Sequence, residues 1–267
     1  MEKKDYYDEN GYLVCGKCHT RKQRDVTFPT LNGEQKKTVR VEKACECKKK
    51  EREESLRKQS EWRLESLRRD GIIDPLYSQY LFEKDDNRAF EISQVCRRYV
   101  ENWKEMLKEN IGILFYGGVG TGKTFLACCI ANALIEKFIP AHVTNFPRIL
   151  NDLQGYKKNE KPQEIIDKLN RYKLLVIDDL GVERDTAFSV EQVYNVIDSR
   201  YRTGMPVIIS TNLSIEDFKT PPSLAHARIY DRVLEMCPIR LKLTGESRRI
   251  AIANARKMKA RKLLGLN

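Results

Sequence analysis

The chain has 267 residues, a formal net charge of +11 and eight cysteines. This length suffices for one large α/β domain with a smaller appendage, and the basic balance favours nucleic acid or another polyanion as a partner. No apolar run is long enough to span a membrane, and the first residues lack a signal-peptide pattern. We therefore expect a cytoplasmic chain, without membrane contact, whose cysteines are thiols or metal ligands.

Four cysteines near the start form two close pairs, Cys15 with Cys18 and Cys45 with Cys47. The segment between the pairs contains Asn32-Gly33 between extended stretches, which predicts a β-hairpin. Two pairs joined by a hairpin bring four thiolates around one Zn²⁺ ion, and metal binding would stabilise a module with little core. Two alternatives remain, a site that includes His19 and unligated thiols.

The next stretch, Lys48 to Arg69, is dense in mixed charge, and Gly71 is placed as a helix stop. Leucines at 56, 64 and 67 are spaced for one helical face. The pattern predicts an exposed helix, either a solvated linker or a helix that docks a partner.

Two elements then precede the first motif. Leu76 to Phe82 is short and aromatic, and it either packs as an entry segment or lies against a nucleotide base. Ala89 to Leu107 has the apolar spacing of one long amphipathic helix.

The motif that dominates the chain is a glycine-rich loop between an apolar run at 111–116, expected as a strand, and another at 125–134, expected as a helix. We expect nucleotide contacts from Gly117, Gly118, Val119, Gly120, Thr121, Gly122, Lys123, Thr124 and Phe125. Glycines let backbone N–H groups close around phosphates, and the helix start adds its positive dipole end. Lys123 would neutralise phosphate charge and Thr124 would ligate Mg²⁺, which predicts ATP or GTP binding.

A second motif, Leu174 to Gly181, is an apolar run that ends in two carboxylates, Asp178 and Asp179. Such a run is typical of a buried parallel strand, and open α/β sheets place their chemistry at the carboxyl ends of their strands. We expect Asp178 to hold Mg²⁺ and Asp179 to orient or deprotonate the water that attacks the γ-phosphate.

Strands and helices alternate through the rest of the chain. We expect strands at 140–145, 207–212 and 239–243, and helices at 149–153, 190–202 and 223–235. Asn212, at the polar end of its strand, is placed to reach the γ-phosphate or the attacking water, although it can equally be a simple strand terminator. The alternation predicts a three-layer α/β sandwich with a parallel sheet. After Glu246 the tail has basic residues and no acidic ones, so it is either a nucleic-acid contact or a partly disordered end.

Taken together, the loop ending Gly122-Lys123-Thr124, the Asp178-Asp179 strand and the strand end Ser210-Thr211-Asn212 resemble the AAA+ ATPases of the DnaC/DnaI helicase-loader group, and also IstB. The resemblance covers about residues 72 to 250. It implies that Arg228 or Arg232 is an arginine finger that faces the ATP of a neighbouring subunit, and that Arg248 senses the γ-phosphate. The few residues after Arg248 imply that the helical lid domain of many AAA+ proteins is reduced here. The cysteine pairs resemble the zinc-binding, helicase-docking module of DnaI-type loaders.

The sequence therefore predicts a zinc module at 1–50, a linker helix at 51–71, an AAA+ domain at 72–250 and a basic tail at 251–267. The favoured function is an oligomeric ATPase, dependent on Mg²⁺ and stimulated by DNA, that loads a DnaB-type replicative helicase onto single-stranded DNA. The alternatives are an IstB-like transposition helper on duplex DNA and a P-loop kinase for a small metabolite.

Overall fold

The computed structural model describes residues 4–29, 36–155, 161–182 and 186–266. The chain divides into two compact units, Met1–Arg63 and Leu64–Asn267. Within the described ranges, no helix has both the length and the apolar character that a membrane span requires.

The first unit consists of two small antiparallel β-pairs and the first part of a helix. β1 (Tyr6–Tyr7) pairs with β2 (Leu13–Val14), and β3 (Gln23–Pro29) pairs with β4 (Lys36–Glu42). The β3–β4 pair confirms the expected hairpin, and its Asn32-Gly33 turn lies outside the described residues. Among the described residues of this unit, the buried hydrophobic side chains are Val14, Cys15 and Cys45, so the unit has almost no apolar core.

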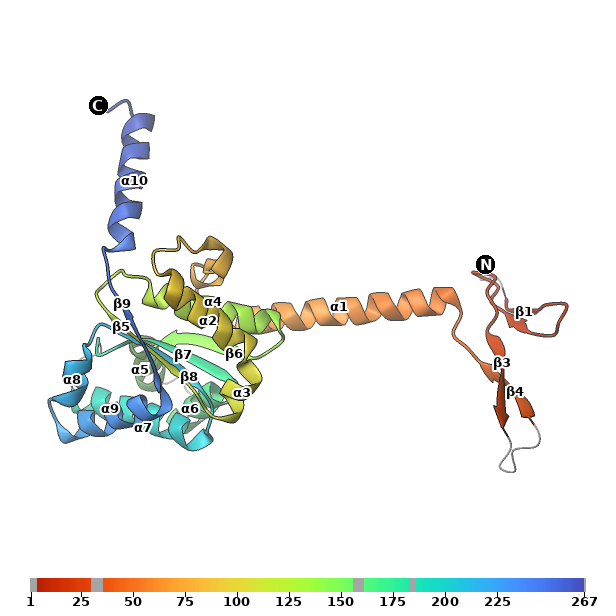
Figure 1. Cartoon of the computed structure of the whole chain (residues 1–267), viewed down its shortest axis with the longest axis horizontal. Helices are drawn as coiled ribbons and strands as arrows, with labels where there is room; N and C mark the ends of the chain where they lie inside the picture. The colour runs from red at the N-terminus through yellow and green to blue at the C-terminus, as the bar shows by residue number, and fades with distance from the viewer. Residues whose placement is uncertain (1–3, 30–35, 156–160, 183–185, 267) are drawn as a thin grey trace. The chain divides into compact units, whose positions relative to one another are not determined.

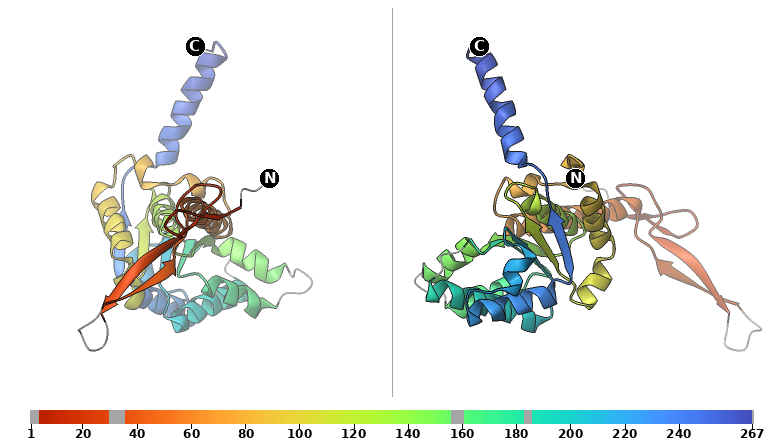
Figure 2. Two further views of the ribbon diagram at one scale, coloured as in Figure 1. Left: turned by 90° about the vertical axis from the view of Figure 1, so that its right-hand side faces the viewer. Right: turned by 60° about the vertical axis from the view of Figure 1, so that its left-hand side comes forward.

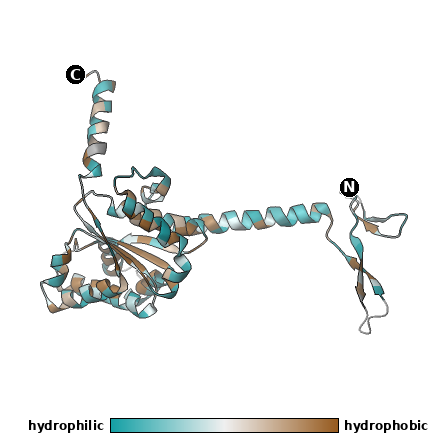
Figure 3. Ribbon diagram, viewed as in Figure 1, coloured by the Kyte–Doolittle hydropathy of each residue, from teal (hydrophilic) through white to brown (hydrophobic). Residues whose placement is uncertain are grey.

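Helix α1 (Glu46–Gly71) contains the boundary between the units and ends at the glycine expected to stop it. Its surface is almost entirely hydrophilic (Figure 3). Leu64 and Leu67, in the second unit, pack against that unit's core, whereas Leu56 and Trp62 are exposed. The leucines therefore do not form one free docking face.

The second unit is built on a five-stranded sheet with strand order β6-β7-β8-β5-β9, and every neighbouring pair is parallel. Its strands are β5 (Ile113–Gly117), β6 (Ala141–Asn145), β7 (Leu174–Leu180), β8 (Val207–Thr211) and β9 (Ile239–Leu243). All five expected strands are present. The central strands are continuous apolar runs because both faces of the sheet are covered (Figure 3).

Helices form a layer on each face of the sheet (Figures 1 and 2). One layer contains α2 (Phe90–Glu101), α3 (Trp103–Lys108) and α4 (Lys123–Glu136). The other contains α5 (Phe146–Gln154), α6 (Pro162–Asn170), α7 (Ala187–Thr203) and α9 (Leu224–Met236), with the short α8 (Ile215–Lys219) packed on α9. Alternate residues of one strand serve the two layers, as Ile113 and Leu114 do. This arrangement confirms the predicted three-layer α/β sandwich.

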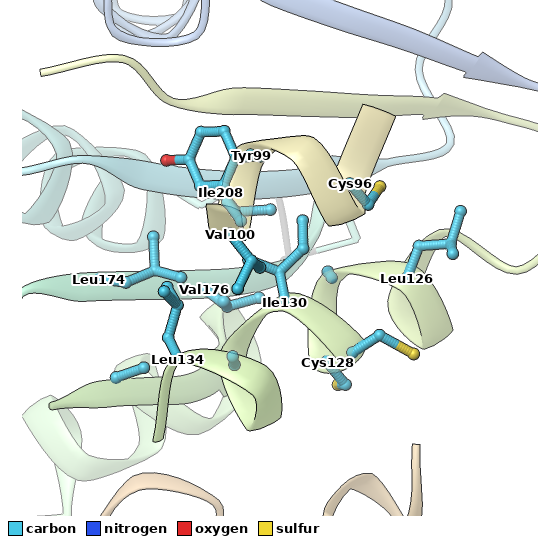
Figure 4. Packing of buried hydrophobic residues seen from close by; sticks show 14 of the residues in the cluster. Cys96, Tyr99, Val100, Leu126, Cys128, Ile130, Leu134, Leu174, Val176 and Ile208 are labelled. Carbon is cyan, nitrogen blue, oxygen red and sulfur yellow. The ribbon is translucent and has the colours of Figure 1, made fainter. Parts of the chain in front are cut away.

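The core beneath α4 is densely filled. Side chains of α2 (Val100), α4 (Ile130) and β7 (Val176) meet there (Figure 4), and Ile130 is fully buried. Two short 3₁₀ segments, η1 (Tyr77–Gln79) and η2 (Phe82–Lys84), lead into this layer. Tyr77 of η1, Phe82 of η2 and Tyr80 between them pack in this core, so the aromatic entry segment does take part in packing.

The prediction of one long helix over 89–107 was wrong, because α2 ends at Glu101 and α3 begins at Trp103. Asn102 interrupts them: its side-chain amide donates to the Arg98 carbonyl, and its own carbonyl accepts from the N–H groups of Glu105 and Met106. An asparagine side chain that competes for backbone acceptors favours such a break, which apolar spacing alone does not reveal.

The end of the chain forms helix α10 (Arg248–Leu263), which follows β9 and belongs to the second unit. It is the one helix after β9 in the described part of the chain, as expected for a reduced lid. The expected exposed loop at 155–162 lies mostly outside the described residues.

Candidate nucleotide site

The sheet brings the three strongest sequence signals to one edge. The glycine loop follows β5, the aspartate pair ends β7 and Asn212 follows β8. These strands are parallel neighbours, so their carboxyl ends meet. The residues singled out from sequence therefore form one cluster, joined by the contacts described below.

The glycine loop depends on backbone conformations that favour glycine. Gly120 and Gly122 have φ angles of 79° and 108°, and Gly122 directly precedes α4. A Cβ atom at Gly122 would lie 2.9 Å from the Arg248 side chain, and one at Gly120 would collide with Ser247. Only glycine fits where the start of α10 approaches the loop.

Lys123 lies inside the loop and is 5% exposed. Its Nζ donates to the carbonyls of Gly117 (2.9 Å) and Gly118 (2.7 Å) and to Oδ1 of Asn212 (2.8 Å). Burial lowers the pKa of Lys123, while the nearby charges of Asp179 and Asp178 act to raise it. The lysine thus joins the loop to the exposed amide at the end of β8.

Asp178 is 3% exposed and is fixed by two hydroxyl groups. The Thr124 hydroxyl donates to both carboxylate oxygens at 2.9 Å, and Ser210 donates to Oδ1. Burial raises the pKa of this carboxyl, whereas the hydrogen bond from Ser210 and the one from Thr124 lower it. A buried carboxylate beside a hydroxyl is a donor set suited to Mg²⁺.

The backbone at the second aspartate is strained. Asp179 has a φ angle of 59°, in a region that side chains other than glycine rarely adopt, and the β7–β8 register shifts between Ile177 and Leu180. The Asp179 N–H donates to the Ser210 hydroxyl at 3.1 Å, which holds this conformation. Strain of this kind gathers at functional sites.

Arg248 lies over the loop. Its backbone N–H donates to the Gly120 carbonyl at 2.9 Å, and its guanidinium pairs with Asp85 (3.6 Å) and Asp86 (3.2 Å). Within the described ranges, the buried Nε atom has no hydrogen-bond partner, and Nη2 makes no hydrogen bond beyond its ion pair with Asp86. An anion at the loop would supply the acceptors that these nitrogens lack.

The two candidate finger arginines lie on α9 and differ sharply. Arg232 pairs with Asp198 at 2.6 Å and lies over the Tyr194 ring. Arg228 is exposed. In the described parts of the chain Arg228 has no ion pair, and neither arginine is hydrogen-bonded to the glycine loop. Arg228 is thus the freer of the two to reach another molecule.

Sequence reasoning missed three residues of the site. Ser210 has no role in the sequence prediction, although a hydroxyl two residues before Asn212, on the same face of an apolar strand, is a usable signal. Asp85 and Asp86 gave no signal, because they meet Arg248 only through the fold.

The four predicted cysteines form a second cluster, in the first unit. Their sulfur atoms all lie within 4.8 Å of one another. Zn²⁺ bound at about 2.3 Å from each sulfur would hold them about 3.8 Å apart, so the group fits this ion. His19 is outside the group that the described residues form and is instead hydrogen-bonded to the Tyr6 hydroxyl at 3.1 Å.

The parallel sheet, the glycine loop between β5 and α4 and the carboxylates at the end of β7 define a P-loop ATPase fold of the AAA+ type. The model of the IstB-like ATP binding protein family matches residues 89–256, and the chain belongs to this family. ATP is therefore the nucleotide that the family binds, which decides between the ATP and GTP expectations.

Two helicase loaders and an insertion-sequence protein are similar to the chain. It is 29% identical over 149 residues to the replicative helicase loader DnaI of Bacillus subtilis, covering 52% of this chain and 47% of DnaI. It is 24% identical to the replicative helicase loader DnaC of Escherichia coli, covering 60% and 65%. The match to the Bacillus thuringiensis IS232 putative ATP-binding protein is 29% identical and covers 54% and 58%. The aligned part of the chain thus spans about half the length of DnaI and of the insertion-sequence protein.

Solved structures confirm the fold. A DnaI crystal structure superimposes with a TM-score of 0.55 at 21% identity, covering 67% of this chain and 96% of that one. A DnaC helicase-loader structure gives 0.55 at 23% identity, covering 64% and 100%. The chain is therefore homologous both to the helicase loaders and to the insertion-sequence ATPases. This homology alone does not decide between helicase loading and help in transposition.

Proposed function

We propose that the chain is an ATP-switched loader of a DnaB-type replicative helicase on single-stranded DNA. The observation that carries the proposal is that one chain contains both the glycine-loop cluster and, in a separate unit, a four-cysteine cluster. The similarity to DnaI and DnaC supports it. In this proposal the helicase docks on residues 1–50, and residues 51–71 link that module to the ATPase domain. ATP and DNA bind to residues 72–250, and the basic residues of 251–267 add contacts to the DNA.

In the ATP site, the N–H groups of residues 117–125 cradle the phosphates, and the Lys123 ammonium exchanges the loop carbonyls for β- and γ-phosphate oxygens. Thr124 and Asp178 would hold Mg²⁺, which neutralises charge on those oxygens when bound. Asp179 orients the attacking water, and Asn212 contacts the water or the γ-phosphate while still hydrogen-bonded to Lys123.

The state of the nucleotide would be transmitted by two arginines. Arg248 exchanges its ion pairs with Asp85 and Asp86 for the γ-phosphate, which moves the start of α10 relative to the loop. Arg228, exposed on α9, reaches the ATP of a second copy and stabilises transition-state charge there. Hydrolysis and subunit contact are thereby linked in a homo-oligomer.

The test is co-purification with a replicative helicase. Full-length chain, a chain that begins at Leu64 and a Cys15→Ser/Cys18→Ser variant are compared. Beginning at Leu64 keeps Leu64 and Leu67 in the core of the second unit. We expect only the full-length chain to retain the helicase, while all three bind ATP. Equal retention by the truncated chain would overturn the role given to the cysteine unit.

A second candidate is an IstB-like helper ATPase that oligomerises on duplex DNA and assists transposition. It is favoured by the family model that matches residues 89–256 and by the insertion-sequence relative. ATP hydrolysis measured with single-stranded and with duplex DNA separates the two. Stimulation by duplex DNA alone, without helicase binding, would select the helper.

A further inference from the structure

One amide interrupts the apolar surface of α4. Asn132 is 5% exposed and lies among fully buried residues of the helix, such as Ile130 and Ala131. Its Nδ2 lies 2.9 Å from the Tyr77 carbonyl, 2.9 Å from the Tyr80 carbonyl and 3.1 Å from the Cys128 carbonyl. Carbonyl oxygens only accept, so these neighbours fix which end of the amide faces them.

Two of these acceptors belong to η1 and the residue that follows it. This segment has no place in the sheet, and its other hydrogen bonds in the described chain are short-range, as in Tyr80 N–H to the Tyr77 carbonyl. Asn132 therefore attaches the segment to the helix that begins at the glycine loop. Without this donor, the Tyr80 carbonyl would lose its hydrogen-bond partner among the described residues, and the Tyr77 carbonyl would keep only the Tyr80 N–H.

The attached segment forms one wall of a cavity of about 510 Å³. The Tyr80 ring packs on the Phe125 ring at 5.3 Å between centroids, and Phe125 directly follows Thr124. Arg248 lines the same cavity, and its backbone N–H donates to the Gly120 carbonyl of the loop. The cavity thus lies beside the phosphate cradle and offers aromatic side chains to a flat ring, as a nucleotide base requires.

We propose that Asn132 is a positioning residue for recognition of the nucleotide base. By holding the Tyr77 and Tyr80 carbonyls, it fixes the Tyr80 ring against Phe125 and so preforms the base cavity. The inference rests on the proposed function, in that a nucleoside triphosphate occupies the glycine loop. Asn132 itself touches neither phosphate nor base.

The role predicts a selective defect. Loss of the amide would loosen the wall that meets the base and leave the loop, Lys123 and Thr124 in place, because their hydrogen bonds do not involve Asn132. Binding of ATP should weaken, whereas binding of inorganic tripolyphosphate, which has no base, should not. A purely structural role would weaken both or neither.

The experiment is calorimetric titration of the full-length chain with MgATP and with magnesium tripolyphosphate. Asn132→Leu removes the donor at similar size. Asn132→Ser keeps a donor for the Cys128 carbonyl but is too short for the segment, and it serves if the leucine variant does not fold. Tyr80→Ala removes the ring and keeps the amide. Cys129→Ala, a truncation of a buried neighbour on α4, is the matched control.

We expect the Kd for ATP to rise about tenfold in the Asn132 variants, the size expected for two lost hydrogen bonds. A similar rise is expected for Tyr80→Ala, which removes the ring that packs on Phe125. The Kd for tripolyphosphate should stay within about twofold, and Cys129→Ala should change neither. Unchanged ATP affinity, or equal weakening of both ligands, would overturn the inference. Failure of the unaltered chain to bind either ligand would instead overturn the proposed ATP site.

Discussion

In the unit that begins at Leu64, apolar side chains fill both faces of the sheet, and polar groups gather at one edge of it. In the unit that ends at Arg63, the buried hydrophobic side chains among the described residues are only Val14, Cys15 and Cys45. Cys15 and Cys45 belong to the cluster of four thiols. The first arrangement is stabilised by burial, and the second requires a cross-link. We therefore expect that loss of a metal bound by the four cysteines unfolds the first unit and leaves the ATP site intact.

Removal of zinc should produce the largest effect. Structural Zn²⁺ contributes about 10 kcal/mol or more of folding free energy in small modules, so a chelator or Cys15→Ser should unfold the first unit. Hydrogen exchange of the full chain, read separately for the two units, measures this together with zinc content. The control is Cys96→Ser, a buried thiol outside the cluster. Retained protection of β3 and β4 after zinc loss would contradict the comparison.

The next effect concerns catalysis in the sheet unit. Arg228→Ala should lower ATP turnover by about 10³-fold, the usual range for an arginine finger, without lowering the melting temperature, because Arg228 is exposed. Arg232→Ala should lower the melting temperature, because it removes the pair with Asp198 and the packing on Tyr194.

Mixing Arg228→Ala with Lys123→Ala chains should partly restore turnover, since each supplies what the other lacks at a shared site. Full activity of Arg228→Ala, or loss of turnover in Arg232→Ala without loss of stability, would assign the finger to Arg232 instead of Arg228.

Apolar burial should decide the stability of the sheet unit. Ile130→Ala removes a fully buried side chain and should lower the free energy of unfolding by about 2–5 kcal/mol, with zinc content unchanged. Chemical denaturation followed by circular dichroism measures it. Leu56→Ala on the exposed part of α1 is the control and should change stability by less than about 0.5 kcal/mol. A small effect at Ile130 would weaken the contrast between the units.

The smallest effect is a pH dependence at His142, which is buried, stacked on Tyr172 and hydrogen-bonded to the Asp70 carbonyl. Burial lowers the pKa of His142 below its ordinary value of 6.5, with Arg148 acting in the same direction and Asp152 against it. The unfolded chain then binds the proton more readily, so stability is present above about pH 6.5 and falls as the pH drops below it. Thermal unfolding of the sheet unit from pH 7.5 to 5.5 should show this fall, and His142→Phe should reduce it. An equal fall in both chains would assign it to other groups.

The sequence predicted those features whose cause is local. Apolar runs and, at 239–243, an alternating pattern predicted strands that are all present, and the glycine loop and aspartate pair predicted the edge where Lys123 and Asp178 meet. The break at Asn102 was missed because hydrophobic spacing continues across it while the asparagine amide competes for backbone acceptors.

Other features depend on contacts between segments that are distant in sequence. The pairing of Arg248 with Asp85 and Asp86, and of Asn132 with η1, arises only when the fold is complete. The difference between Arg228 and Arg232 likewise depends on Asp198 from α7, which spacing along α9 does not reveal. The sequence motifs thus located the site, whereas tertiary packing determines which of its side chains are free to bind a ligand or another subunit.

The most direct test of the account is nucleotide binding by full-length Lys123→Ala. Lys123 joins the glycine loop to Asn212 and lies beside the carboxylates of β7, so its loss should weaken ATP binding about 100-fold and abolish DNA-stimulated hydrolysis. Calorimetry with MgATP measures the first and phosphate release the second, with an unchanged melting temperature as proof of folding. ATP affinity and turnover equal to those of the unaltered chain would contradict the claim that this cluster is an ATP site.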